Sequence, residues 1–126
     1  MEIKARFDHF NINVTDLDRS VEFYRNSLGL EKVGEIIPES GEFKIYYLSN
    51  SLNTFRLELT WLKDKEGPYE LGDNESHLAV RVDGDYDAIR QFHKDNGWVC
   101  FENEAMGIYF IHDPDDYWIE ILPVKH

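Results

Sequence analysis

Two histidines and two glutamates recur at matching places in the two halves of the sequence. His9 opens the stretch HFNINV and His77 opens HLAVRV, while Glu58 lies within RLELT and Glu120 within WIEIL. A lone histidine or glutamate on a strand is more often structural or solvated than a ligand, but here both types occur twice. Two imidazoles and two carboxylates suit a divalent transition metal such as Zn²⁺, Ni²⁺, Co²⁺, Mn²⁺ or Fe²⁺. The sequence therefore predicts that His9, Glu58, His77 and Glu120 bind one metal ion.

The segments around these four residues alternate between apolar and polar side chains, as half-buried strands do. In each segment the predicted ligand lies on the polar face, away from the apolar face that would meet a core. We expect the polar face of the first segment to line a site, with Asn11 and Asn13 as substrate contacts. The expected apolar faces are Phe10, Ile12 and Val14; Leu57, Leu59 and Trp61; Leu78, Val80 and Val82; and Ile119 and Ile121.

A shift of 68 residues places HFNINVTDLDRSVEFYRNSLGL, from His9, on HLAVRVDGDYDAIRQFHKDNGW, from His77. Each copy predicts a strand followed by a helix. In the first helix Asp16 or Asp18 can cap the start, Gly29 stops the end, and the buried stripe is Leu17, Val21, Tyr24 and Leu28. In the second helix Asp83 or Asp85 opens, Gly97 ends, and the buried stripe is Ile89 and Phe92.

Three further strand-like segments follow each helix. They are EKVGEIIP, FKIYYLS and TFRLELTW in the first copy, and WVCFE, GIYFIHD and YWIEILPV in the second, where the offset has fallen to 62. The fold class is therefore α+β, with a βαβββ module about 6–62, a polar connector about 63–75 and a second module about 76–124. Each module alone would leave one sheet face exposed, so the two must pack or pair. If the first and last strands of each module are neighbours, the four predicted ligands would meet around a pseudo-twofold axis.

The remaining histidines lack this repeated setting. His93 is expected on an exposed helix face, His112 at the entry to a turn, and His126 at the end of the chain. Tyr109 and Phe110 could both line a cleft, but core packing is the better expectation for one of them.

Composition narrows the class of protein. The 126 residues suffice for one domain with a core, and the formal net charge of −12 argues against a nucleic-acid partner, which needs clustered Lys and Arg. The single cysteine, Cys100, excludes an intrachain disulfide and fits a reducing compartment. No apolar run is long enough for a membrane span or a signal peptide, so we expect a cytoplasmic protein that binds a small molecule, with no membrane partner.

The stretches HFNINVTDLDRSVEFYRNSLGL and IHDPDDYWIEIL resemble the vicinal oxygen chelate superfamily, and within it the glyoxalase I (lactoylglutathione lyase) type. The resemblance spans nearly the whole chain. It implies curved mixed sheets around a metal cleft, the glyoxalase/bleomycin resistance/dioxygenase fold, with His9, Glu58, His77 and Glu120 at the metal positions. It also implies a homodimer with sites shared between subunits, one divalent metal per site with Ni²⁺ or Zn²⁺ preferred, and Trp118 lining the cleft.

The implied reaction isomerises the hemithioacetal of a 2-oxoaldehyde and a thiol to a thioester. It needs a carboxylate that moves a carbon-bound proton to the adjacent carbon, and we expect Glu120 to be this base, with Glu58 a ligand and second base. The alternatives are another metalloenzyme of the superfamily (a dioxygenase, epimerase or thiol transferase) acting on an oxygen-chelating substrate, or a small-molecule binding protein without catalysis.

Three positions depart from the pattern that binds glutathione in this family. Where the family commonly has arginine, arginine and asparagine, this chain has Asn13, Asp73 and Leu62. Arg56 could hold one anionic group of a substrate, whereas Arg81 is expected to be an exposed strand residue. The sequence thus keeps the predicted metal ligands but lacks the usual contacts to glutathione. It therefore does not identify the thiol.

Overall fold

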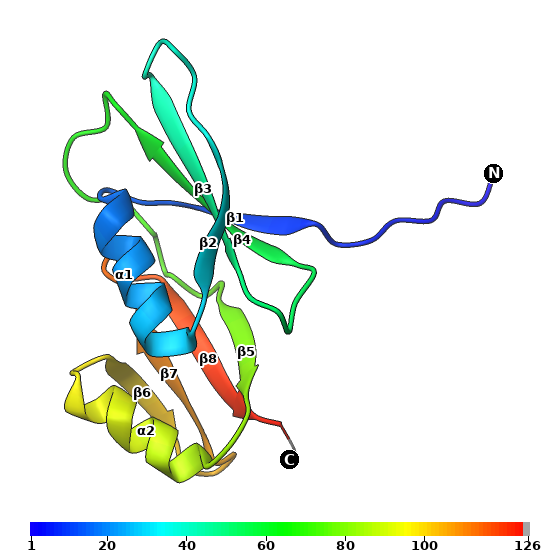
Figure 1. Ribbon diagram of the computed structural model, residues 1–126. Helices are drawn as coiled ribbons and strands as arrows, with labels where there is room; N and C mark the ends of the chain where they lie inside the picture. The colour runs from blue at the N-terminus through cyan, green and yellow to red at the C-terminus, as the bar shows by residue number, and fades with distance from the viewer. Residues whose placement is uncertain (125–126) are drawn as a thin grey trace. The chain divides into compact units, whose positions relative to one another are not determined.

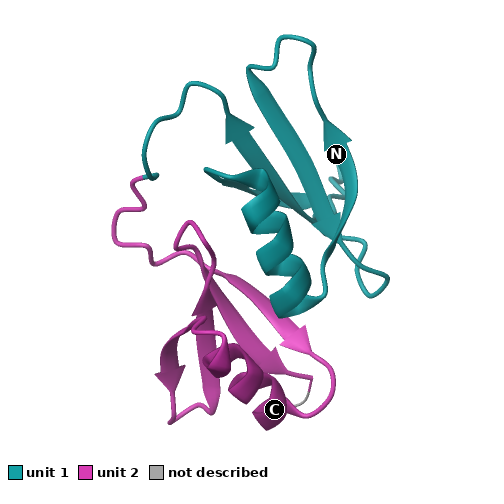
Figure 2. Cartoon of the chain, turned by 60° about the vertical axis from the view of Figure 1, so that its left-hand side comes forward, with its two compact units in different colours: residues 1–69 teal, residues 70–126 magenta. Residues whose placement is uncertain are grey.

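The computed structural model describes residues 1–124, which divide between two compact units, one of residues 1–69 and one that starts at residue 70 (Figure 2). The first unit contains β1 (His9–Asn13), α1 (Leu17–Leu28), β2 (Glu31–Ile36), β3 (Phe43–Ser49) and β4 (Arg56–Leu62). The second contains β5 (Leu78–Val82), α2 (Tyr86–Asp95), β6 (Val99–Asn103), β7 (Ile108–His112) and β8 (Trp118–Pro123). Each unit is thus a βαβββ arrangement, and the α+β fold class is confirmed (Figure 1).

The two sheets have the same topology. Their strand orders are β1-β4-β3-β2 and β5-β8-β7-β6. In each, the first strand pairs in parallel with the last, and the other pairs are antiparallel. The parallel register sets Asn11 opposite Glu58 and Ala79 opposite Glu120. His9 begins β1 and His77 directly precedes β5, so each predicted histidine lies at the start of a strand that runs beside the strand of its own glutamate.

The first helix begins and ends as the sequence predicts. The Asp16 side chain caps it by accepting a hydrogen bond from the backbone N–H of Arg19 at 3.1 Å. Gly29 ends it in the left-handed conformation, at a φ of +68°, where a side chain would be strained. Three of the four predicted stripe residues, Leu17, Val21 and Tyr24, are buried, and the helix packs over β2 and β4.

In the second helix the buried residues differ from those predicted. Its cap is Asp85, but Phe92 is 50% exposed and His93 is fully buried. The buried side of the helix follows Tyr86, Ile89 and His93, so residue 93 and not residue 92 lies over the sheet. The His93 imidazole Nδ1 lies 2.8 Å from the hydroxyl of Tyr109, which gives both polar groups a partner inside the core. The prediction of an exposed His93 was wrong for this reason.

Alternation along the strands is otherwise confirmed. Leu57, Leu59, Ile119 and Ile121 are at most 4% exposed. Phe10 is the exception, since it is 45% exposed at the start of an edge strand. Of the pair considered for the core, Tyr109 is buried and Phe110 is not.

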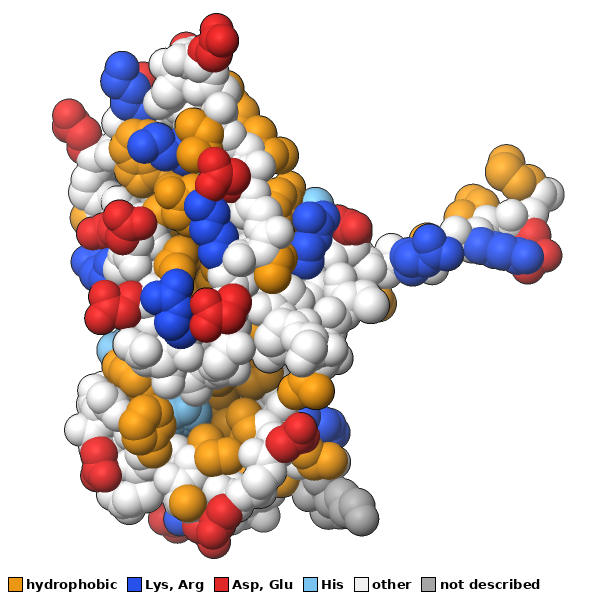
Figure 3. All heavy atoms as spheres, viewed as in Figure 1, with side chains coloured by type: hydrophobic (Ala, Val, Ile, Leu, Met, Phe, Trp, Pro, Cys, Tyr) orange, Lys and Arg blue, Asp and Glu red, His pale blue; other side chains and the backbone are white. Residues whose placement is uncertain are grey.

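Residues 1–8 belong to no helix or strand and project from the first unit (Figures 1 and 3). This arm exposes the apolar side chains of Met1, Ile3 and Phe7 next to the basic side chains of Lys4 and Arg6. Elsewhere on the face shown in Figure 3, acidic and basic side chains are interspersed over the first unit. No helix within residues 1–124 is long and apolar enough to cross a membrane.

Candidate metal centre

The first unit brings His9 and Glu58 together on the sheet face opposite α1. The Nε2 atom of His9 lies 3.4 Å from Oε2 of Glu58. The side chain of Glu58 is 12% exposed and that of His9 36% exposed, so the pair is accessible without lying free in solvent. This closeness follows from the parallel pairing of β1 with β4.

The other side of the His9 ring faces a carboxylate. Nδ1 of His9 lies 2.6 Å from Oδ2 of Asp8, and the same oxygen accepts a hydrogen bond from Nη2 of Arg56 at 2.9 Å. These two hydrogen bonds, from His9 first and Arg56 second, lower the pKa of Asp8 below its usual value. Because an ionised carboxylate only accepts hydrogen bonds, the neutral His9 ring carries its proton on Nδ1, which leaves a lone pair on Nε2 for a metal ion.

The adjacent strand supplies a second contact to the pair. Tyr47 on β3 is the register partner of Glu58, so the two side chains share one face of the sheet. The interaction of its hydroxyl with the Glu58 carboxylate, with burial adding to it, raises the pKa of Tyr47, so the phenol stays protonated. The guanidinium of Arg56 lies over the Tyr47 ring, with Cζ 4.1 Å from the ring centroid.

The amides predicted to contact substrate lie farther along the same face. Nδ2 of Asn11 donates to Oδ1 of Asn13 at 2.9 Å, and the hydroxyl of Thr60 donates to Oδ1 of Asn11 at 2.5 Å. The three side chains form a polar row beside Glu58. Their role as substrate contacts stays a prediction.

The second unit holds the corresponding pair in an apolar setting. Nε2 of His77 lies 3.8 Å from Oε1 of Glu120. Phe110 is the register partner of Glu120, and its ring lies edge-on to that of His77 with centroids 5.1 Å apart. The Nδ1 atom of His77 is 3.5 Å from the backbone oxygen of Glu75.

An aromatic wall, composed of Phe101, Phe110 and Trp118, extends from this second pair. Trp118 stacks on Phe101 with a centroid distance of 6.3 Å and lies 5.6 Å from Phe110. Trp118 lies two residues before the glutamate of the second unit, and Arg56 lies two residues before the glutamate of the first. The two residues therefore occupy equivalent positions. The two half-sites match in their ligands and differ in their surroundings.

The donor set fits a divalent cation. Two ligand atoms each about 2.1 Å from one ion, at angles of about 90–110°, lie about 3.0–3.4 Å apart. The His9–Glu58 separation of 3.4 Å falls at that limit, and the His77–Glu120 separation of 3.8 Å needs only a small side-chain rotation. Within residues 1–124, no group of three or more His, Cys, Asp or Glu side chains is assembled for a metal, so each unit presents one pair.

The other candidates lie outside these pairs. His112 ends β7 and its Nδ1 lies 3.2 Å from Oδ1 of Asp116, while His126 lies outside the described residues. Arg81 donates to the backbone oxygen of Pro123 at 2.6 Å, in agreement with a structural role. Leu62 and Asp73 occupy two of the positions at which the family pattern predicts contacts to glutathione. Both residues are exposed.

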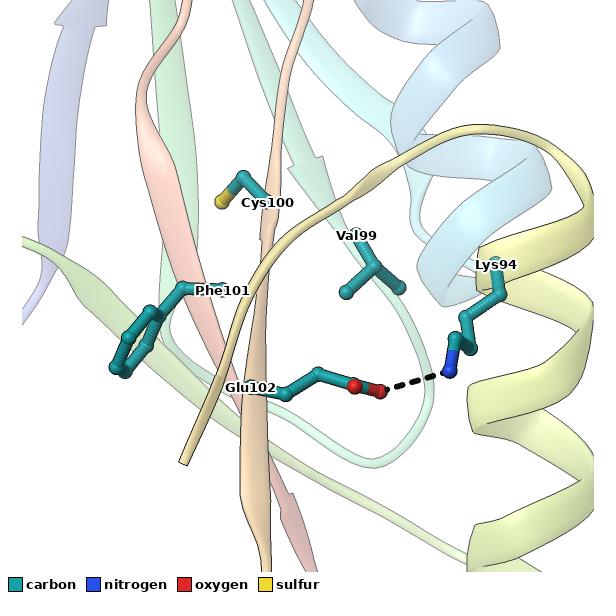
Figure 4. A pocket seen from close by; sticks show the side chains of 5 residues that line it. All are labelled: Lys94, Val99, Cys100, Phe101 and Glu102. Carbon is teal, nitrogen blue, oxygen red and sulfur yellow. Dashed lines mark ion pairs between the residues drawn. The ribbon is translucent and has the colours of Figure 1, made fainter. Parts of the chain in front are cut away.

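A hollow of about 300 Å³ lies between the end of α2 and the edge strand β6. Figure 4 shows Lys94 and Glu102 meeting across it, at 3.2 Å, while the ring of Phe101 points away from this ion pair. Burial raises the pKa of the Cys100 thiol to about 11, so this cysteine is protonated and a poor nucleophile near neutral pH. The hollow contains none of the four predicted ligands.

Sequence reasoning missed two residues that contact the predicted ligands, Asp8 and Tyr47. Neither has a counterpart of the same chemistry in the second copy, where Ser76 precedes His77 and Phe110 faces Glu120. The predicted ligands were identified because they recur in both copies. Residues that occur in one copy only cannot be identified in this way.

The fold consists of two βαβββ units, and each unit brings one histidine close to one glutamate where its first and last strands run in parallel. The chain belongs to the Glyoxalase/Bleomycin resistance protein/Dioxygenase superfamily, whose family model matches residues 6–121. The resemblance predicted from the sequence is thereby confirmed.

Comparison with individual relatives gives a more specific result than the family model. The chain is 32% identical to the lactoylglutathione lyase of Neisseria meningitidis, over 95% of this chain and 91% of that protein. It is also 32% identical to a probable lactoylglutathione lyase of Synechocystis, over 90% and 92% respectively. Among solved structures, glyoxalase I of Leishmania major matches with a TM-score of 0.84 at 27% identity, over 97% of this chain and 88% of that one. Glyoxalase I of Zea mays matches with a TM-score of 0.78 at 25% identity, over 92% of this chain and 43% of the longer maize chain.

Proposed function

We propose that this protein is a metal-dependent lyase of the glyoxalase I type, which converts the hemithioacetal of a 2-oxoaldehyde and a thiol into a thioester. The observation that carries the proposal is the pairing of a histidine with a glutamate in each unit, on matching strands. The similarity to lactoylglutathione lyases over nearly the whole chain supports it. Glyoxalases of this superfamily are metal-dependent enzymes.

In this proposal His9, Glu58, His77 and Glu120 hold one divalent ion, Ni²⁺ or Zn²⁺ before Co²⁺, Mn²⁺ or Fe²⁺. When bound, the ion supplies charge stabilisation for the two neighbouring oxygens of the substrate, on which negative charge develops. The four residues come from a homodimer whose sites are shared between subunits. A cytoplasmic location is also part of the proposal.

The proton transfer is assigned to Glu120. Its carboxylate removes the proton from the carbon that bears sulfur and returns it to the neighbouring carbon, so the hemithioacetal carbon becomes the thioester carbonyl and no proton is gained or lost. Glu58 is assigned as a ligand because it faces the hydroxyl-bearing side chain of Tyr47, whereas Glu120 faces the apolar ring of Phe110. A carboxylate that must leave and re-enter a ligand position works best where no hydrogen-bond donor fixes it.

The identity of the thiol is the part of the substrate that the proposal does not specify. Asn13, Leu62 and Asp73 replace the residues that usually bind the carboxylates of glutathione, and Arg56 already pairs with Asp8. The Leishmania major relative is described as trypanothione-dependent, so thiol choice differs among glyoxalase I enzymes. We propose that Trp118 and the polar row of Asn11 and Asn13 contact the substrate.

The missing contacts to glutathione favour one alternative, a different metal-dependent reaction on an oxygen-chelating substrate. A turnover assay separates the two. Metal-free protein is reloaded with Ni²⁺, Zn²⁺, Co²⁺ or Mn²⁺, and thioester formation from methylglyoxal is followed by ultraviolet absorbance with glutathione and with other low-molecular-weight thiols. We expect turnover with at least one metal and thiol. Stoichiometric metal binding without thioester formation from any thiol would favour the alternative reaction.

A further inference from the structure

Three side chains of the first unit border the pair His9–Glu58. Asp8 contacts His9 at 2.6 Å and Arg56 at 2.9 Å, and the Arg56 guanidinium lies 4.1 Å from the centre of the Tyr47 ring. Tyr47 is the register partner of Glu58, whose Oε2 lies 3.4 Å from Nε2 of His9. We call Asp8, Tyr47 and Arg56 the support triad.

Each contact of the support triad acts on one degree of freedom of a predicted ligand. The Asp8 carboxylate fixes the tautomer and the rotation of the His9 ring, because only Nδ1–H can satisfy it. Tyr47 lies beside Glu58 on the same sheet face, where its hydroxyl limits the rotation of the carboxylate, and the edge-on packing of the Tyr47 ring against His9, with a centroid distance of 5.9 Å, limits the tilt of His9. Arg56 links Asp8 to Tyr47 and so keeps both in place.

The second unit has the same strands without the triad. Ser76, Phe110 and Trp118 stand where the first unit has Asp8, Tyr47 and Arg56. There His77 and Glu120 lie 3.8 Å apart, and Nδ1 of His77 lies 3.5 Å from the backbone carbonyl oxygen of Glu75. The repeat therefore holds one supported pair and one pair set among aromatic rings.

We propose that Asp8, Tyr47 and Arg56 are positioning residues that preorganise His9 and Glu58 for a divalent cation, so that the first unit is the fixed half of the metal centre. This inference rests on the metal centre of the proposed function. It does not depend on the identity of the thiol or on the reaction. Asp8 acts through His9, and Tyr47 acts through Glu58, so neither needs to touch substrate.

The first test removes Asp8. Asp8→Ala is compared with Asp64→Ala, an exposed aspartate in the turn after β4. Nitrogen-15 NMR of the metal-free protein, at a pH where imidazoles are neutral, should show His9 protonated at Nδ1 in the unaltered protein and mixed between Nδ1 and Nε2 in Asp8→Ala. The Ni²⁺ dissociation constant, measured by calorimetry without substrate, should rise about 10- to 100-fold in Asp8→Ala and stay unchanged in Asp64→Ala.

The second test removes one oxygen atom. Tyr47→Phe keeps the ring under Arg56 and deletes the donor to Glu58, and Tyr46→Phe makes the same change at the neighbouring residue, whose ring contacts Lys32. We expect Ni²⁺ binding to weaken about 3- to 10-fold in Tyr47→Phe and to stay unchanged in Tyr46→Phe.

The outcomes separate this inference from the proposed function. A His9 tautomer that is the same with and without Asp8, or Ni²⁺ affinity unaltered in both Asp8→Ala and Tyr47→Phe, would overturn the positioning role whatever the enzyme catalyses. Weaker metal binding in these variants, together with no thioester formation by the unaltered protein, would uphold the positioning role and reject only the reaction. Thermal unfolding of each variant checks that the loss is not a loss of fold, and Asp8, with 68% of its side chain exposed, is a mild site for truncation.

Discussion

Glu58 and Glu120 are the same residue type in different surroundings, and the proposed function assigns them different roles. Both lie in the middle of the last strand of a unit, close to the predicted histidine of that unit. Glu58 faces Tyr47, which carries a hydroxyl, and Glu120 faces Phe110, which carries none. A fixed carboxylate is the better permanent ligand, and a carboxylate without such a donor is the better proton carrier.

This difference leads to a prediction for the isosteric amides. Glu120→Gln should lower kcat about 10²- to 10⁴-fold while most of the bound metal is retained, because the amide cannot accept the substrate proton. Glu58→Gln should chiefly lower the metal content of the purified protein. Metal analysis and steady-state kinetics of both variants measure the two effects. Full kcat in Glu120→Gln would contradict its assignment as base.

Cys100 gives a prediction that can be checked without substrate. Its pKa is raised to about 11 by burial. At pH 8 about one thiol in a thousand is then ionised, against about one in ten at the usual value of 9.0. Alkylation by iodoacetamide should therefore be slow at pH 8 and accelerate steadily up to about pH 11, since only the thiolate reacts. Protein unfolded in urea serves as the control, and equal rates in folded and unfolded protein would contradict the prediction.

Residues that repeat could be predicted, and residues that do not repeat could not. His9, Glu58, His77 and Glu120 stood out because each half carries the same types on the same face. Asp8 and Tyr47 gave no such signal, because their effect depends on which atoms the neighbouring strands bring within hydrogen-bond distance. Strand register, which the sequence leaves undetermined, decides that Tyr47 and not Tyr46 faces Glu58.

At the scale of elements, all ten helices and strands of the structure had been expected from hydrophobic periodicity and turn residues. The two copies differ mainly in the lengths of the connections between their strands. The offset between the copies falls from 68 at β1 and β5 to 63 at β3 and β7, so most of the extra residues lie in the β2–β3 hairpin. Surface hairpins accept insertions without disturbing the strands that carry the ligands.

The second helix explains the main error in the predicted core. Phe92 is more hydrophobic than His93, and pattern reasoning assigned the larger apolar residue to the buried stripe. The capping aspartate and the spacing from Tyr86 turn residue 93 inward, where the hydroxyl of Tyr109 makes a polar ring acceptable. Phe92 instead packs its ring against Trp98, at a centroid distance of 5.8 Å.

A stability prediction follows for this buried contact. Tyr109→Phe removes the hydroxyl beside His93 and should lower the free energy of unfolding by about 1–3 kcal/mol, because a buried imidazole nitrogen loses this partner. Tyr46→Phe, whose ring lies beside Lys32, should change it by less than about 0.5 kcal/mol. Urea unfolding measures both. Equal stabilities would show that the His93–Tyr109 contact contributes nothing.

At the scale of the whole molecule, each unit supplies one histidine and one glutamate. We keep 6–62 and 76–124 as the proposed limits of the two modules and 63–75 as the connector. The sequence could predict that the modules must combine to cover their sheets. It could not predict whether the modules of one chain or of two chains combine at a metal, because both choices use the same residues on the same strands.

Complementation between two inactive variants decides that question. If a site takes His9 and Glu58 from one subunit and His77 and Glu120 from the other, mixing His9→Ala with His77→Ala chains creates one intact site per mixed dimer. We expect each variant alone to be inactive and co-expressed chains to recover about a quarter of the activity, since half of randomly formed dimers are mixed and each has one of two sites. Turnover of the co-purified chains, tagged differently, measures this. No recovery in verified mixed dimers would indicate that one chain builds the site alone.

The exposed arm at residues 1–8 makes the amino terminus the expected first target of trypsin, which cuts after Lys4 and Arg6. Cleavage after Arg6 would spare every strand and leave Phe7 as the first residue. Its new α-ammonium group would adjoin Asp8 and compete with His9 and Arg56 for that carboxylate. Proteolytic trimming of a few residues can therefore alter the charge next to a predicted ligand while the fold stays intact.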